Sequence, residues 1–84
     1  MNIYVGNLAL EVTEGELRQE FLPFGVVTSV TMMNDKYIGS GQQRGYSFVE
    51  MPSIKEGEAG ITGLNEKVIK GRDIHLVTPL WKNP

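Results

Sequence analysis

Cysteine is absent from this 84-residue sequence, and histidine occurs once, as His75. Without cysteine the chain can form neither a disulfide nor a thiolate metal site, and one histidine alone does not make a metal centre. A chain of this length forms one small domain, so its stability has to come from the packing of a single core. We therefore expect no metal and no cofactor.

Long apolar segments are also missing, since no run approaches the ~18 residues that a membrane-spanning helix needs. The initiator Met is followed at once by an expected strand, which leaves no room for a signal peptide. We therefore expect a soluble, cytoplasmic protein without membrane contact, or a domain trimmed from a longer chain. No nucleophile, acid–base pair or metal set is assembled in the sequence, so we expect no enzyme activity.

Positive charge is scarce as well: 8 Lys and Arg residues stand against 10 Asp and Glu residues, for a net charge of −2. The distribution of charge matters more than its sum. Most of the acidic residues lie in or beside the two expected helices: Glu11, Glu14, Glu16, Glu20, Glu56 and Glu58. A mildly basic sheet edge and an ordinary solvated surface both fit this distribution. In either case non-specific affinity for phosphate should be modest.

What the sequence does have is a run of alternating character from Arg44 to Met51, RGYSFVEM. In a strand, Tyr46 and Phe48 point to one face, while small and aliphatic residues point to the other. Exposed apolar surface costs roughly 25 cal/mol per Å², so adjacent rings on the open face of a sheet require a function. The opposite assignment would bury the rings and leave Gly45, Ser47 and Val49 facing water, which is unfavourable.

A second stretch, Ile3 to Leu8, places Tyr4 on the face opposite Ile3 and Val5. If the two strands are neighbours, Tyr4, Tyr46 and Phe48 form one surface, which we call the aromatic platform. Flat rings can stack unpaired bases, and the nearby Arg44 guanidinium can contact phosphate. The alternative for Arg44 is a surface ion pair with an acidic neighbour, which is worth only ~0–1 kcal/mol.

These two stretches resemble the paired ribonucleoprotein motifs of the RNA-recognition motif (RRM) family. Arg44 to Met51 fits the eight-residue motif, and Ile3 to Leu8 is similar to its six-residue partner, about forty residues away as in that family. The resemblance implies an α+β, ferredoxin-like β-α-β-β-α-β fold, with one four-stranded antiparallel sheet and both helices on one face. It also implies that Tyr4 and Tyr46 each stack one base, that Phe48 inserts between sugars and that Arg44 contacts the backbone.

The expected partner is thus single-stranded RNA, with about two to four bases on the sheet, and single-stranded DNA remains open. Further contacts are expected from residues at the rim of the platform and in the tail: Asn2, Thr31, Met33, Lys36, His75 and Trp81. The competing hypothesis is a protein-interaction domain of RRM-like fold, to which the acidic pI of about 5.3 lends some weight. Domains of that kind typically lack the platform aromatics and carry Arg-x-Phe after the second helix, where this chain has Gly71-Arg72-Asp73-Ile74.

Local signals place the first half of the fold. Strand 2–6 is followed by a helix that begins after Thr13, with Glu16 completing a capping box, and that ends near Leu22 because Pro23 follows. Strand 26–33 comes next, and the different parity of its inward-facing valines predicts a bulge between Val27 and Val30.

The second half follows the central strand. Ser53 and Glu56 predict a second capping box, and three glycines interrupt the helix after it. An edge strand at 67–69 and a last strand from Asp73 to Thr78 complete the predicted domain, residues 1–78, with a tail at 79–84. RRM domains commonly have Gly at the position of Glu66, so the turn there departs from the pattern. We expect a stand-alone, monomeric domain.

Overall fold

The computed structural model describes residues 1–35 and 44–78, with the backbone alone at positions 34, 35 and 44. Its elements are, in chain order, β1 (Asn2–Leu8), α1 (Glu14–Phe21), a 3₁₀ turn (Leu22–Phe24), β2 (Ser29–Asp35), β3 (Arg44–Glu50), α2 (Ile54–Leu64), β4 (Val68–Ile69), β5 (Arg72–Asp73) and β6 (His75–Val77).

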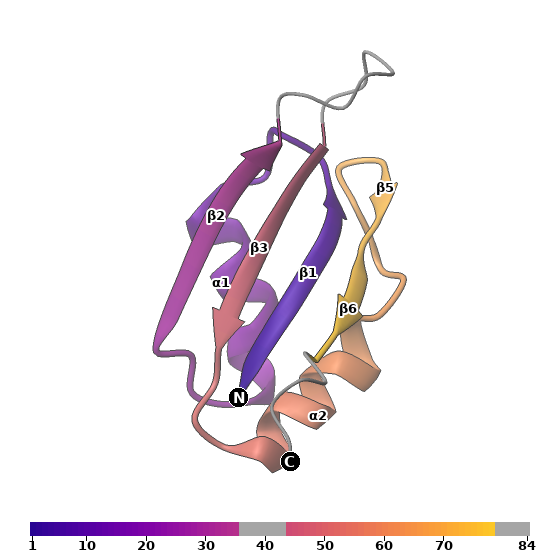
Figure 1. Cartoon of the computed structure of the whole chain (residues 1–84). Coiled ribbons are helices and arrows are strands. Elements are labelled where there is room, and N and C mark those ends of the chain that lie inside the picture. The colour runs from indigo at the N-terminus through magenta and orange to yellow at the C-terminus, as the bar shows by residue number, and fades with distance from the viewer. Residues whose placement is uncertain (36–43, 79–84) are drawn as a thin grey trace.

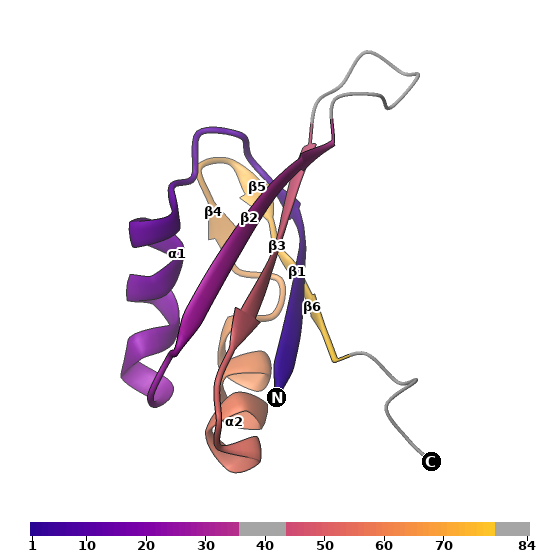
Figure 2. The ribbon, with the colours of Figure 1, turned by 60° about the vertical axis from the view of Figure 1, so that its left-hand side comes forward.

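The main sheet has four strands in the order β2-β3-β1-β6, and each neighbouring pair is antiparallel. Both helices cover one face of this sheet and leave the other open (Figures 1 and 2). The predicted α+β, ferredoxin-like fold is therefore confirmed. The expected edge strand at 67–69 forms as β4, but it pairs with β5 in a separate two-stranded sheet.

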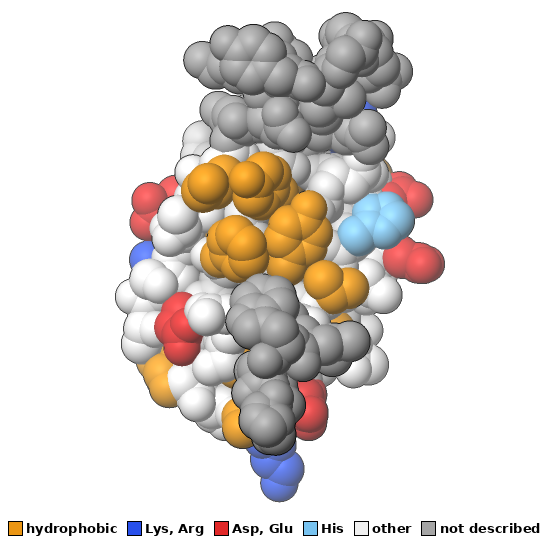
Figure 3. Space-filling model, viewed as in Figure 1, with side chains coloured by type: hydrophobic (Ala, Val, Ile, Leu, Met, Phe, Trp, Pro, Cys, Tyr) orange, Lys and Arg blue, Asp and Glu red, His pale blue; other side chains and the backbone are white. Residues whose placement is uncertain are grey.

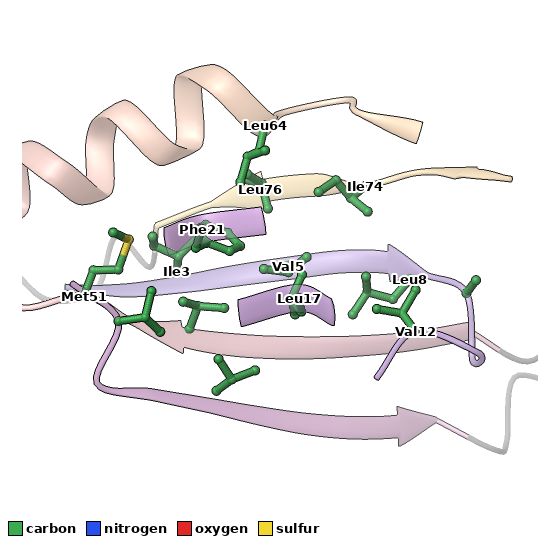
Figure 4. Packing of buried hydrophobic residues seen from close by; sticks show 14 residues of the cluster. Ile3, Val5, Leu8, Val12, Leu17, Phe21, Met51, Leu64, Ile74 and Leu76 are labelled. Atoms are coloured by element: carbon green, nitrogen blue, oxygen red, sulfur yellow. The ribbon is translucent and has the colours of Figure 1, made fainter. Parts of the chain in front are cut away.

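The core lies between the open sheet and the two helices (Figure 4). Ile3 and Val5 of β1 are fully buried there, against Leu17 and Phe21 of α1. Leu64 of α2 adds to the cluster near the last strand. Because β1 is a central strand, its inward face sits in the middle of the core and its outward face in the middle of the open surface.

The capping box at the start of α1 forms as predicted. The Glu16 backbone N–H donates to the Thr13 hydroxyl, and the Thr13 N–H donates to Glu16 Oε1 at 2.9 Å. The bond from Thr13 and the nearby Lys70 ammonium hold the pKa of Glu16 below its ordinary value of 4.5. The helix ends at Phe21, and Pro23 lies in the 3₁₀ turn that follows, where its missing N–H is harmless.

The bulge predicted between Val27 and Val30 is wrong. Strand β2 begins only at Ser29 and pairs with β3 without a break in register. Val27 is buried but precedes the strand, so the alternation rule does not apply to it. The break in register is in β1 instead, where Val5 pairs with Ser47 and Leu8 with Gly45.

The second capping box forms only in part. Ser53 Oγ accepts from the Glu56 N–H at 3.2 Å, as expected. The Glu56 carboxylate, however, accepts from the Val26 N–H at 3.1 Å and so fastens α2 to the segment before β2. In a complete capping box, the Glu56 carboxylate would accept from the Ser53 N–H. Here the Val26 N–H, from a distant part of the chain, takes that place.

The glycines of α2 mark close packing. A Cβ on Gly57 would collide with Met1 Sδ, and one on Gly60 would lie 3.3 Å from Phe21 Cδ1. A Cβ on Gly63 would lie 2.5 Å from Phe24 Cζ, closer to an aromatic ring than a Cβ on Gly60 would. The Phe24 ring therefore occupies the space that a side chain at position 63 would need.

Within residues 1–35 and 44–78, no helix has the length and apolar character required to cross a membrane.

Candidate nucleic-acid interface

The strand register brings the three predicted rings together on the open face. Tyr4 of β1 pairs with Phe48 of β3 on one side and with Val77 of β6 on the other. Phe48 in turn pairs with Thr31 of β2. These four positions form one row across the middle of the sheet, and Tyr46 lies two residues from Phe48 along β3.

The rings contact one another closely. The ring centroids of Tyr4 and Tyr46 are 5.7 Å apart, with the planes tilted by 36°. Phe48 packs edge-on against both, at 5.7 Å from Tyr4 and 6.2 Å from Tyr46. All three side chains are half-buried, because each covers part of the others. The aromatic platform is thus a packed surface with one side open to a ligand.

The opposite face explains why the rings are outside. Gly45, Ser47 and Val49 alternate with them along β3, and all three are buried. The alternation predicted for Arg44 to Met51 is therefore confirmed. Ser47 fits this face by its small size, and within the described residues its buried Oγ has no hydrogen-bond partner.

Several of the expected rim residues surround the platform. Met33 lies opposite Tyr46 and is 40% exposed, and Thr31 lies opposite Phe48 and is exposed. His75 is exposed on β6 opposite Gly6, and Asn2 is exposed at the start of β1. Figure 3 shows hydrophobic side chains gathered on this face over the central strands.

Three of the predicted residues lie wholly or partly beyond what the structure describes. Lys36 and Trp81 are outside the described residues. Arg44 is described by its backbone only, which pairs with Asp35 at the start of β3. The structure thus assembles the aromatic part of the predicted site and does not test its cationic part.

Val77 and Gly6 were not predicted from the sequence as site residues, although both lie on the platform face. Val77 is 54% exposed beside Tyr4, and the alternation of the last strand was the signal that pointed to it. Gly6 lies directly beneath the ring of Tyr4, at 2.8 Å between a Cβ placed on Gly6 and Tyr4 Cε2. No sequence signal distinguished this glycine from an ordinary strand residue.

Described cations are mostly engaged away from the platform. Lys67 pairs with Glu20 and Lys70 with Glu16, which fastens the β4 region to α1. Arg72 Nη2 donates to the Asn7 side chain at 2.7 Å. On the open face, Glu50 accepts from the N-terminal amine at 3.2 Å. The described part of the platform therefore offers apolar and aromatic contact and little positive charge.

Among the described side chains, no three His, Asp or Glu residues are grouped so that they could hold a metal ion.

A four-stranded antiparallel sheet with helices on one face and three clustered rings on the other defines a ribonucleoprotein-type RNA-binding domain. Residues 3–75 match the model of the RNA recognition motif family. The chain belongs to this family, and RNA binding is the function that membership supports, in preference to the peptide binding of the competing hypothesis.

Individual proteins show the same likeness. The chain is 42% identical to RbpF, a Nostoc sp. protein named for RNA binding, over 90% of this chain and 70% of that protein. The crystal structure of RNA-binding protein PG1 is 34% identical with a TM-score of 0.80, and the match covers 100% of this chain and 98% of PG1. The RRM of Rna15, solved with the RNA GU bound, shares the fold at a TM-score of 0.76 and 22% identity, over 94% of this chain and 82% of that one.

Proposed function

We propose that this protein binds single-stranded RNA on the aromatic platform formed by Tyr4, Tyr46 and Phe48. The observation that carries the proposal is the cluster of three rings, with centroids 5.7 to 6.2 Å apart, on the only sheet face that the helices leave open among the described elements. Unpaired bases stack on such rings, whereas the bases of a duplex are already stacked on each other.

The geometry suggests different roles for the three rings. Tyr4 and Tyr46 are inclined by 36°, so each can offer a face to its own base. Phe48 stands edge-on to Tyr46, at 86°, which suits insertion between sugars better than stacking beside the same base. About two to four nucleotides would cover this area, with Arg44 on the phosphate backbone. These roles follow the family pattern at the matching positions.

The names of the relatives agree with this proposal. RbpF and PG1 are both named as RNA-binding proteins, and the Rna15 domain has been solved with RNA on the same fold. We extend the proposal to a monomeric, non-enzymatic, cytoplasmic module whose domain covers residues 1–78. Single-stranded DNA is the natural competitor in any binding assay, because stacking does not require the 2′-hydroxyl.

Alanine substitution of the platform rings tests the proposal. Stacking on one ring is worth ~1–3 kcal/mol, so Tyr46→Ala and Phe48→Ala should each weaken RNA binding by roughly ten- to a hundredfold. The probe is an oligonucleotide selected from a randomised single-stranded RNA pool, titrated by fluorescence anisotropy. Because the rings are half-buried and pack on one another, each variant should also lose about 0.5–1.5 kcal/mol of stability per lost ring pair.

Phe24→Ala is the matched control, because it also removes a half-buried ring but from the helical side of the domain. It should lower the melting temperature and leave RNA affinity unchanged. Equal loss of affinity in Phe24→Ala and Phe48→Ala would mean that binding merely follows stability. A wild-type protein that binds no member of the pool at micromolar concentration would refute the RNA platform.

Salt dependence gives an independent check on how the RNA is held. With few cations on the described face, the plot of log affinity against log salt should be shallow, at ~0.7 per phosphate for about one to three phosphates. A slope corresponding to about six phosphates or more would place most of the binding energy on a basic surface instead of on the rings.

A further inference from the structure

The ring of Tyr4 lies over Gly6, two residues further along β1 on the same face of the sheet. A Cβ on Gly6 would lie 2.8 Å from Tyr4 Cε2, 3.2 Å from Cζ and 3.1 Å from the hydroxyl oxygen. Real Cβ atoms essentially never approach another atom as closely as the first of these distances. The ring therefore occupies the volume that any larger residue at position 6 would fill.

The Tyr4 ring therefore does not stand above its own backbone position but extends over the next cross-strand row, which contains Gly6. The Tyr4 backbone pairs with Phe48 and Val77, but Gly6 pairs with His75. Because the ring leans over Gly6, its edge reaches toward the row of Tyr46 and His75. The centroids of the Tyr4 and Tyr46 rings are 5.7 Å apart, which agrees with this position of the Tyr4 ring.

The backbone does not by itself explain the glycine. Gly6 and Asn7 form the break in register of β1, and bulges often contain a glycine with positive φ. Here the residue with positive φ is Asn7, at 58°, and Gly6 does not adopt a positive φ. The φ of position 6 therefore does not require glycine, and the three atoms nearest to a Cβ there all belong to the Tyr4 side chain.

We propose that Gly6 is a positioning residue for RNA binding: its missing side chain lets the Tyr4 ring lie flat toward Tyr46, in the orientation that receives a base. This inference rests on the proposed function for its effect on RNA. Its structural part, the position of the Tyr4 ring over Gly6, can be tested in the protein without RNA. A larger residue would force the ring to stand up from the sheet and would separate the two tyrosines.

A double-mutant cycle tests the proposal. In the wild-type background, Gly6→Ala should weaken binding of the pool-selected RNA by about five- to tenfold, part of the loss expected from removing a stacked ring. In the Tyr4→Ala background, Gly6→Ala should change affinity less than twofold, because the ring that it displaces is gone. Gly15→Ala is the control substitution, since a Cβ there would meet no described atom within 4 Å outside its own stretch of helix.

An equal loss in both backgrounds would overturn the proposal, because Gly6 would then act through the strand and not through the ring. Unchanged RNA affinity in the single variant Gly6→Ala would also overturn it. If Gly6→Ala fails to fold, the double variant with Tyr4→Ala decides: recovery of folding supports a clash with the ring, and continued failure shows a backbone role.

NMR of the free protein separates this inference from the proposed function. The Gly6 Hα protons should show nuclear Overhauser contacts to the Tyr4 ring and a ring-current shift upfield, and Tyr4→Ala should abolish both. Their absence from the wild-type protein would overturn the seating of the ring, whatever the RNA result. If the Overhauser contacts and the upfield shift are present but no RNA binds, the Tyr4 ring does lie over Gly6 and the proposed function is wrong.

Discussion

Gly15 and Gly63 form a matched pair of glycines whose replacement by alanine measures how closely α2 packs. Each lies one residue from the end of its helix, Gly15 near the start of α1 and Gly63 near the end of α2. Outside its own stretch of helix, a Cβ on Gly15 would meet none of the described atoms within 4 Å, whereas one on Gly63 would lie 2.5 Å from Phe24 Cζ and 2.6 Å from Cε1. The two substitutions are alike in backbone effect and differ in contact.

The expected changes have opposite signs. Replacing glycine by alanine at a compatible helical site stabilises by about 0.4–1 kcal/mol, which is the whole effect expected at Gly15. At Gly63 the same gain is opposed by overpacking, which costs about 1–3 kcal/mol when a neighbour has to shift. The Phe24 ring is half-buried, so it can move toward water, but it then loses its contact with the core. The net change at Gly63 should be a loss of about 0.5–2 kcal/mol.

Thermal unfolding followed by circular dichroism distinguishes these outcomes. One kcal/mol shifts the melting temperature of a domain of this size by about 4–8 °C. Gly15→Ala should therefore melt a few degrees above the wild type, and Gly63→Ala a few degrees below it. A rise of equal size in both variants would refute the close packing, because it would show that the Phe24 ring does not occupy this space.

Gly60→Ala should fall between these two variants. The contact there is 3.3 Å to Phe21 Cδ1, so the neighbouring ring has to give by only a few tenths of an ångström. Phe21 is fully buried, however, and cannot swing into water. The gain in helix propensity and the cost of crowding nearly cancel, and a shift of more than about 8 °C in either direction would contradict that balance.

Two further substitutions test single features of the structure. Ser47→Ala removes a buried hydroxyl that has no hydrogen-bond partner among the described residues, so it should stabilise the domain by about 1 kcal/mol in urea unfolding and leave RNA affinity unchanged. A loss of stability would show that Ser47 Oγ makes a hydrogen bond after all. Glu66→Gly should stabilise by about 0.5–1 kcal/mol, because Glu66 has a φ of 67° that glycine adopts without strain. Gly71 has a φ of 87°, and among the described residues no atom beyond its chain neighbours lies within 4 Å of the place of its Cβ, so Gly71→Ala should lower stability. A change of the same sign in Glu66→Gly and Gly71→Ala would exclude backbone strain as the cause.

The β3 half of the platform was predictable from sequence, because alternation along a strand involves only neighbouring residues. Side chains in a strand alternate with a period of two, so Tyr46 and Phe48 had to share a face once Gly45, Ser47 and Val49 were assigned to the core. The same applies to the start of α1, where Thr13 and Glu16 are three residues apart and satisfy each other. In these cases every group involved lies within a few residues of its partner.

The Glu66 turn shows the limit of a local rule. The sequence indicated a departure from the usual glycine but not its consequence, and the structure holds Glu66 in the left-handed conformation nonetheless. The Glu66 N–H donates to Ile74 O, and the Ile74 N–H donates to Lys67 O, both at 2.9 Å. Hydrogen bonds to a segment several residues away thus impose a conformation that the residue itself disfavours.

The sequence by itself determined which face of each strand is apolar, where α1 begins and ends, and that Tyr46 and Phe48 share one face of β3. Tertiary structure decided the rest: the break in β1 at Gly6 and Asn7, the contact of Glu56 with Val26, and the lean of Tyr4 over Gly6. Alternation and capping depend on neighbours along the chain, so they can be read from a few residues. The position of a ring, a bulge or a second hydrogen-bond partner depends on which distant segments compete for the same space, and only the folded chain brings those segments together.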